Sequence, residues 1–164
     1  RIRNFLSRGG IKRDVLDIGR ILDDLLLMLQ TLLGESGVTV EVSIAPNLPV
    51  LRADFVQLQQ VMLNLVVNAV DAMRDPAVNT RILTILVTAS VTEGAVFRFS
   101  DTGLGITPAM QEQIFDALFS TKRDGLGMGL AISRSIIENH GGWLRLETMV
   151  GPGAHFVFNI PNSQ

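Results

Sequence analysis

The stretch QQVMLNLVVNAVDAM at residues 59–73 decides the fold, because it predicts a long helix with one polar row on an apolar surface. Asp54 is a candidate N-cap, and Asp75 and Pro76 end the helix near Met73. Asn64, Asn68 and Asp71 recur at intervals of four and three residues and therefore share one helix face. The opposite positions are apolar, so the helix is expected to pack on a sheet with its polar row facing a cleft or water. These apolar positions are Leu58, Val61, Leu65, Val66 and Val70.

The two asparagines need an explanation, since asparagine inside a helix competes for backbone hydrogen bonds. A site for a hard cation and phosphate provides one. Carboxamide oxygens can ligate Mg²⁺, and water and substrate phosphates complete its shell. A solvated polar strip is the simpler explanation for such a pair taken alone, because short motifs often match by chance.

A second motif, Asp101-Thr102-Gly103-Leu104-Gly105, follows a predicted strand. Glycine allows a ligand to approach the backbone closely, and an ionised carboxylate can only accept hydrogen bonds, for example from an amino group such as that of adenine. A tight turn after a strand would also favour Asp and Gly here.

Two further motifs come later in the chain. Phe115 to Lys122 combines aromatic residues with Ser120-Thr121-Lys122, and lysine is a common phosphate partner; core aromatics beside a solvated lysine are the alternative. In Gly125-Leu126-Gly127-Met128-Gly129-Leu130, alternating glycines precede a predicted helix, which directs free N–H groups and the positive end of the helix dipole toward an anion. A flexible hinge is the alternative. The motif is not a Walker loop, because no Gly-Lys-Ser or Gly-Lys-Thr follows, and the alternating glycines do not fit a dinucleotide-binding fingerprint.

In this order the four motifs resemble the nucleotide-binding boxes of the GHKL ATPases, which include histidine kinases, Hsp90, MutL and type II topoisomerases. QQVMLNLVVNAVDAM resembles the N box, DTGLGI the first glycine box, IFDALFSTK the F box and GLGMGL the second glycine box. HGGWLRLET and RIRNFLSRGG resemble sensor histidine kinases, and the short interval from Lys122 to Gly125 resembles the short-lid group of nitrogen-regulation and oxygen-sensing kinases.

The resemblance implies a role for each matching residue. Asn68 would ligate Mg²⁺, with Asn64 and Lys122 positioning the phosphates of ATP. Asp101 would bind the adenine amino group, with Gly103, Gly105 and Ile106 shaping its pocket. Many family members have lysine where Asp71 stands, so Asp71 would act through the magnesium shell or cap the polar row. Thr121 would contact the lid side or the phosphates, and the triphosphate would be wrapped by the second glycine box: Gly125, Leu126, Gly127, Met128, Gly129 and Leu130.

The remaining pattern predicts one α/β domain. Helices are expected over residues 14–33, 54–73 and 126–140, with a short one from Pro108, and strands over 38–44, 50–53, 82–90, 95–100, 143–149 and 155–160. Strands and helices without regular alternation favour two layers. The resemblance makes this an α+β Bergerat ATP-binding fold, a mixed, mainly antiparallel sheet with about three helices on one face. Residues 1–12 are expected to end a dimerisation helix and form a linker, and residues 13–164 to form the catalytic domain.

Composition limits the function. The 164 residues carry a net charge of -2, which argues against a nucleic-acid partner. The chain has no cysteine, and Asp23, Asp24 and Gln30 interrupt its most apolar run, so a cytoplasmic location is expected, with any membrane anchor in an upstream part of the parent protein.

The kinase resemblance also implies a target outside this chain. No histidine followed by Glu or Asp occurs, and His140 and His155 are better explained by structural roles. The implied partners are therefore the parent protein's own dimerisation and phosphotransfer domain and a response regulator receiver domain. The full-length protein would be a homodimer and the isolated piece a monomer. An anti-sigma serine kinase, an ATP-gated clamp and a non-catalytic docking domain are the alternatives.

Overall fold

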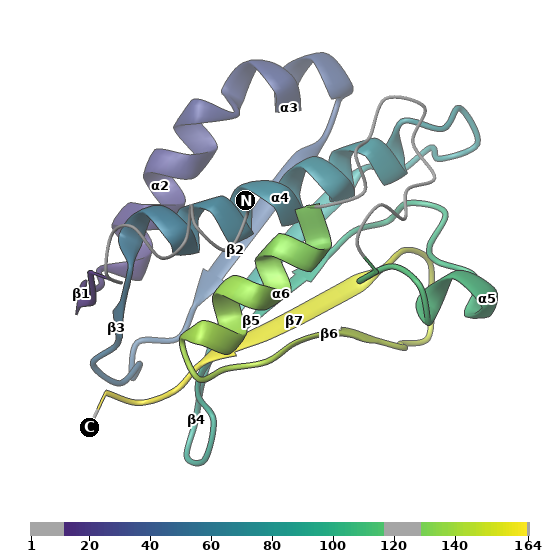
Figure 1. Ribbon diagram of the computed structural model, residues 1–164. Helices are drawn as coiled ribbons and strands as arrows, with labels where there is room; N and C mark the ends of the chain where they lie inside the picture. The colour runs from purple at the N-terminus through teal and green to yellow at the C-terminus, as the bar shows by residue number, and fades with distance from the viewer. Residues whose placement is uncertain (1–11, 117–128, 164) are drawn as a thin grey trace.

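A computed structural model describes residues 12–116 and 129–163 (Figure 1). It confirms the α+β class. In chain order the elements are β1 (Asp14–Val15), α2 (Ile18–Met28), α3 (Gln30–Ser36), β2 (Thr39–Ile44), β3 (Arg52–Ala53), α4 (Phe55–Met73), β4 (Ile82–Ser90), β5 (Gly94–Ser100), α5 (Pro108–Gln111), α6 (Gly129–Asn139), β6 (Leu144–Glu147) and β7 (His155–Ile160).

Five strands form the main sheet in the order β2-β4-β5-β7-β6. Only β2 and β4 run parallel, while the β4–β5, β5–β7 and β6–β7 pairs are antiparallel. The strands predicted over residues 82–90 and 95–100 therefore form an antiparallel hairpin, and the sheet is mixed but mainly antiparallel, as expected.

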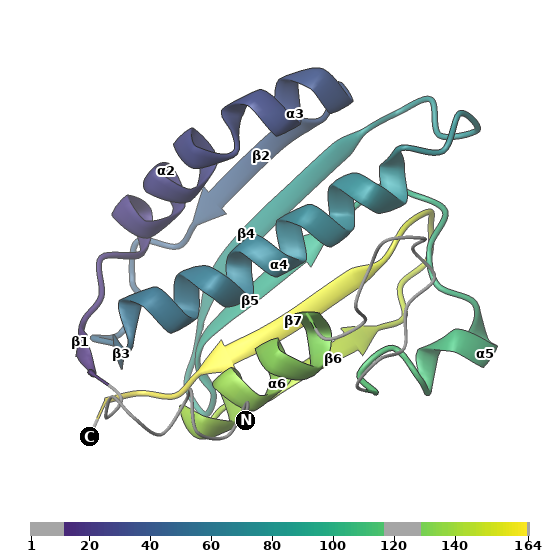
Figure 2. The ribbon, with the colours of Figure 1, turned by 45° about the horizontal axis from the view of Figure 1, so that its top comes forward.

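The long helices α2, α4 and α6 cover one face of this sheet, with α4 crossing its middle (Figures 1 and 2). Alternate residues of β4 and β5 point into the layer between sheet and helices, where Leu83, Ile85, Phe97 and Phe99 are buried. The Phe97 and Phe158 rings stack with their centroids 4.6 Å apart. A continuous apolar core thus fixes α4 on the sheet.

The opposite face of the sheet is more polar. Arg98 on β5 donates to the Glu147 carboxylate on β6 at 2.7 Å. This hydrogen bond and the positive charge of Arg98 lower the pKa of the Glu147 carboxyl. One apolar and one polar face are typical of an antiparallel sheet that packs helices on one side only.

The predicted helix over residues 14–33 is wrong in its bounds. Asp14 and Val15 instead form β1, and α2 begins at Ile18 because Asp17 caps it by accepting a hydrogen bond from the Arg20 N–H at 3.2 Å. The helix is interrupted at Leu29, and α3 continues to Ser36. It ends at Gly37, whose φ of 66° lies in the left-handed region that glycine adopts without strain.

A small second sheet was not expected from the sequence. In it, β1 pairs antiparallel with β3, with Asp14 opposite Ala53. The Leu16 N–H also donates to the Leu51 carbonyl at 3.0 Å. This pairing brings the first described residues beside the start of α4.

Candidate functional site

The polar row of α4 lies where the sequence predicts it. Asp54 is the N-cap, accepting a hydrogen bond from the Gln57 N–H at 3.1 Å. Asn64, Asn68 and Asp71 are half-buried, while Leu65, Val66, Ala69 and Val70 on the same turns are buried in the core. Asp71 also forms an ion pair with Arg74, at 3.5 Å. The apolar turns therefore hold the polar row at a fixed position.

Asn64 connects α4 to the start of α6. Its Nδ2 donates to the Gly129 carbonyl at 3.2 Å and to the Ser133 Oγ at 3.0 Å. Because the Gly129 carbonyl can only accept, these contacts fix which side of the amide carries the nitrogen. A Cβ at Gly129 would lie 3.7 Å from the Asn64 Cγ. The last glycine of the second glycine box thus adjoins the polar row.

The loop after β5 approaches the other end of the same row. An ideal Cβ placed on Gly103 would lie only 2.6 Å from the Ala72 carbonyl oxygen of α4. No side chain fits at that distance, so glycine allows this close backbone approach. Asn64, Asn68 and Ala72 follow one another at intervals of four residues, and Asn68 therefore lies between the two glycine boxes.

Asp101 is buried at the start of this loop, with 5% of its surface exposed. Its Oδ1 accepts hydrogen bonds from the Gly103 N–H at 2.9 Å and the Ala154 N–H at 3.2 Å. Among the described residues its Oδ2 has no hydrogen-bond partner. Burial raises the pKa of the Asp101 carboxyl, whereas the two backbone hydrogen bonds and the nearby His155 act in the opposite direction. The result is a nearly buried acceptor held by two backbone N–H groups.

Contacts across the fold hold the loop in this conformation. The Thr102 hydroxyl accepts from the Ile82 N–H at 3.0 Å and donates to the Thr80 carbonyl. Gly105 and Gly153 have φ values of 81° and 91°. Gly153 packs so closely on the Asp101 backbone that a Cβ there would overlap it. Ile106 packs, partly buried, on the core.

Several contributors were missed by the sequence reasoning. Ser133 holds Asn64, and Gly153 and Ala154 hold Asp101, although they come from elements that follow the recognised motifs in the chain. For Gly153 and Ala154 the available signal was the glycine pair in Gly151-Pro152-Gly153, just before the last strand. Ser133 left no local signal, because a serine within a helix has no obvious pattern.

The other predicted site residues cannot be placed. Six of them lie outside the described residues: Thr121, Lys122, Gly125, Leu126, Gly127 and Met128.

A hollow of about 230 Å³ adjoins Gly105, Ile106, Gly153 and His155, but none of the α4 asparagines lines it. Of the predicted residues, the structure therefore brings together Asn64, Asn68, Asp71, Gly103 and Gly129 around α4, with Asp101 on the adjoining loop.

Both histidines form hydrogen bonds within the domain. His140 is buried, and its Nε2 accepts a hydrogen bond from the Asp54 N–H at 3.0 Å. Its Nδ1 must then carry the proton, which it donates to the Ile136 carbonyl at 2.7 Å. The His155 Nδ1 contacts the Ser100 hydroxyl at 2.8 Å.

The comparisons with known proteins agree with this geometry. Residues 53–164 match the family described as "Histidine kinase-, DNA gyrase B-, and HSP90-like ATPase". The sensor histidine kinase TmoS of Ectopseudomonas mendocina is 35% identical over 163 residues, which is 99% of this chain and 17% of TmoS. The sensor protein FixL of Bradyrhizobium diazoefficiens is 34% identical, over 98% of this chain and 32% of FixL.

Solved structures share the fold. Full-length ShkA in complex with AMPPNP aligns with a TM-score of 0.81 and 27% identity, over 94% of this chain and 32% of that chain. The catalytic domain of the histidine kinase ThkA aligns with a TM-score of 0.80 and 25% identity, over 92% of this chain and 95% of that chain.

Fold and site define a nucleotide-binding domain of the ATPase type. The chain belongs to the family of histidine kinase-, DNA gyrase B- and HSP90-like ATPases, and within it to the ATP-binding catalytic domains of sensor histidine kinases. It spans 17% of TmoS and 32% of FixL, and it matches nearly the whole of the ThkA catalytic domain. None of the helices in residues 12–116 and 129–163 has the length and apolar character needed to cross a membrane.

Proposed function

We propose that this chain binds ATP with Mg²⁺ between α4, the loop at residues 101–106 and the start of α6. One observation carries the proposal: α4 contacts the first glycine box at Ala72 and the second at Asn64, with Asn68 between them. Eight residues of helix separate these two contacts, a distance of about 12 Å. A ligand along this helix face would meet both glycine boxes and the asparagine between them.

Each described residue would have a distinct role. The Asp101 carboxylate would accept a hydrogen bond from the adenine amino group through Oδ2, since the backbone hydrogen bonds go to Oδ1. Gly103 and Gly105 would bring the loop backbone close to the base. At the other end, the first N–H groups of α6, from Leu130 onward, would donate to phosphate oxygens at the positive end of the helix.

The side chains of the polar row suit a magnesium ion shared with phosphates. The described residues contain no group of three or more His, Asp or Glu side chains that could form a metal site by themselves. Asn68 would supply an amide oxygen, which fits Mg²⁺ because this ion keeps several waters and takes other ligands from substrate phosphates. When bound, the ion would neutralise phosphate charge. Asn64, held by Gly129 and Ser133, would position the phosphates beside it.

The parent protein is proposed to be a protein-histidine kinase that transfers the γ-phosphate to a histidine on its dimerisation domain. The name of TmoS, a sensor histidine kinase, supports this activity, and the AMPPNP complex of ShkA supports the nucleotide. A ThkA structure with the same fold, at 22% identity and a TM-score of 0.78, is a complex with the response regulator TrrA. A response regulator is accordingly a proposed partner, and pairing with a second copy of the parent protein stays a prediction from the family resemblance. The cytoplasmic location, the boundary at residue 12 and the roles of Thr121 and Lys122 stay predictions.

Calorimetric titration of the chain with AMPPNP and MgCl₂ tests the proposal. Asn68→Ala should weaken binding at least tenfold, a loss of about 1.4 kcal/mol, and remove the dependence on Mg²⁺. Asn47→Ala removes the same side chain from an exposed turn and should bind like the native chain. In the full-length protein, Asn68→Ala should also abolish autophosphorylation. Native affinity and native magnesium dependence in Asn68→Ala would reject the assignment.

A further inference from the structure

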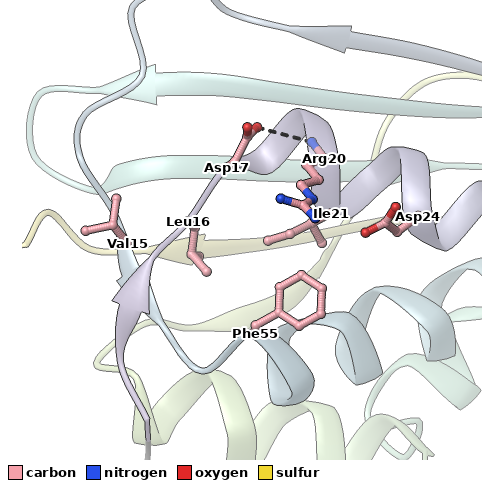
Figure 3. A pocket seen from close by; sticks show the side chains of 7 residues that line it. All are labelled: Val15, Leu16, Asp17, Arg20, Ile21, Asp24 and Phe55. Carbon is pink, nitrogen blue, oxygen red and sulfur yellow. Dashed lines mark hydrogen bonds between the residues drawn. The ribbon is translucent and has the colours of Figure 1, made fainter.

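A hollow of about 300 Å³ lies at the corner where the described chain begins. It is lined by residues that precede or open α2 and by the first residue of α4 (Figure 3). They are Val15, Leu16, Asp17, Arg20, Ile21, Asp24 and Phe55. None belongs to the nucleotide site, so the hollow requires its own explanation.

The hollow exposes apolar side chains. Ile21 is buried, but Val15 is 58% exposed and Phe55 is 37% exposed. In Figure 3 the Phe55 ring points from the first turn of α4 toward α2. Val56, the next residue of α4, is 70% exposed but does not line the hollow. An apolar patch with a concave centre is typical of a surface that another segment covers.

The rim of the hollow carries carboxylates. Asp17 and Asp24 border it together with Arg20, and within residues 12–116 and 129–163 none of the three takes part in an ion pair. The one hydrogen bond between Asp17 and Arg20 uses the Arg20 backbone N–H, which leaves the guanidinium outside that contact. The rim therefore has a net negative charge and suits a basic apolar occupant.

Residues 1–11 of the same chain have matching chemistry. The segment carries Arg1, Arg3 and Arg8 and no acidic residue. Three of its four large apolar residues, Ile2, Phe5 and Leu6, are spaced three and four apart from Ile2 and would share one face of a helical turn, while Ile11 follows the glycines. Charge and apolar content both complement the hollow.

The connection to β1 also permits the contact. Lys12 is two residues before β1, and Val15 at the end of β1 already lines the hollow. The seven Cα–Cα steps from Phe5 to Lys12 can span at most about 24 Å, whereas the 11-residue α2 is about 16 Å long. Gly9 and Gly10 within this span would allow the chain to reverse its direction.

We propose that residues 1–11 dock intramolecularly in this hollow, with Phe5 and Leu6 packed against Phe55 and the arginines beside Asp17 and Asp24. Because Phe55 is the first residue of α4, the docked segment fixes the upstream chain relative to the helix that carries Asn64 and Asn68. The contact is independent of nucleotide binding, so it can be tested without a ligand.

NMR of the full 164-residue chain provides the test. Methyl and aromatic labelling should show nuclear Overhauser effects between Phe5 or Leu6 and the side chains of Val15, Leu16 and Phe55. The double substitution Phe5→Ala/Leu6→Ala should shift the Leu16 and Ile21 methyl resonances and speed amide exchange at Ile21 about tenfold, because local opening then costs less. The control Asn4→Ala/Ser7→Ala alters polar side chains of the same segment and should leave both unchanged.

Two results from these spectra would overturn the proposal, and a third comes from a substitution in the hollow. One is superimposable Leu16 and Ile21 resonances in the native chain and in Phe5→Ala/Leu6→Ala. The other is Overhauser effects that arise only between labelled and unlabelled chains in a mixed sample, since a second copy would then occupy the hollow. Phe55→Ala provides the reciprocal check from the hollow side. It should remove the contacts of Phe5 while the resonances of β4 and β5 keep their native dispersion, and persistence of those contacts would also overturn the proposal.

Discussion

Gly103→Ala tests whether the close approach of the loop to α4 is needed for both stability and binding. The added Cβ would lie 2.6 Å from the Ala72 carbonyl oxygen, 2.8 Å from its carbonyl carbon and 3.0 Å from its Cβ. Two of these three atoms belong to the backbone of α4, so no rotation of a side chain relieves the overlap. Either the end of α4 or the loop at residues 101–106 must move.

The size of the effect follows from this geometry. Forcing extra carbon atoms into packed structure costs about 1–3 kcal/mol. For a domain of this size 1 kcal/mol changes Tm by about 3 °C, so Gly103→Ala should lower Tm by about 3–9 °C. The Gly103 N–H also holds the Asp101 carboxylate at 2.9 Å. Displacing the loop therefore moves the proposed adenine acceptor, and AMPPNP affinity should fall at least about tenfold.

Calorimetric unfolding and nucleotide titration measure the two effects on one sample. Gly34→Ala is the matched control, because Gly34 is exposed within α3 and an added Cβ would meet nothing within 4 Å. Alanine is favoured over glycine inside a helix by about 0.5–1 kcal/mol, so this control should raise Tm slightly and leave affinity unchanged. Native Tm together with native affinity in Gly103→Ala would refute the reasoning.

Three further substitutions separate binding from stability. Asp101→Asn should abolish AMPPNP binding but raise Tm relative to the native chain at pH values above the ordinary carboxyl pKa of 3.8. Burial raises the pKa of Asp101 in the folded state, so ionisation of this carboxyl destabilises the folded state relative to the unfolded chain. A Tm difference that does not shrink as the pH falls toward 4 would contradict this. Ser133→Ala removes one of two hydrogen bonds that hold Asn64, so it should lower the free energy of unfolding by about 1 kcal/mol and weaken AMPPNP binding. Ser135→Ala, on the exposed side of the same helix, should not change affinity. Equal affinities of the two variants would contradict the positioning role of Ser133. His140→Ala leaves the Asp54 N–H without its acceptor, at a cost of about 1–3 kcal/mol, and should therefore lower Tm by about 3–9 °C. Circular dichroism checks that the fold persists, and an unchanged Tm would show that water replaces the imidazole.

The helix and the polar row could be predicted because their signals are local. The N-cap at Asp54 and the spacing of Asn64 and Asn68 depend only on residues within one helix, and both are found as expected. The end of the first helix was misplaced because two glycines, Gly34 and Gly37, stand close together. Only the conformation tells them apart, since Gly37 has the positive φ that ends a helix.

The rest of the site depends on contacts that sequence spacing does not reveal. Ala154 holds the Asp101 carboxylate from 53 residues away, and Ser133 holds Asn64 from 69 residues away. These partners are set by which strands are neighbours in the sheet and by how α6 lies against α4. Local periodicity carries no information on either, so the motifs predicted the chemistry of the site but not the residues that support it.

The two sides of α4 explain how a polar site can persist within this core. Two half-buried asparagines and a buried carboxyl are unfavourable for folding by themselves, because each polar group leaves water and must be hydrogen-bonded or remain unsatisfied. The apolar side of α4, with Leu65, Val66, Ala69 and Val70 on the same turns, compensates for this by burial against the sheet. Since both sides belong to one rigid helix, the burial that stabilises the domain also sets the spacing between the two glycine boxes. Stability and site geometry are therefore coupled through α4, and substitutions on its buried side should affect nucleotide affinity only when they move the helix on the sheet.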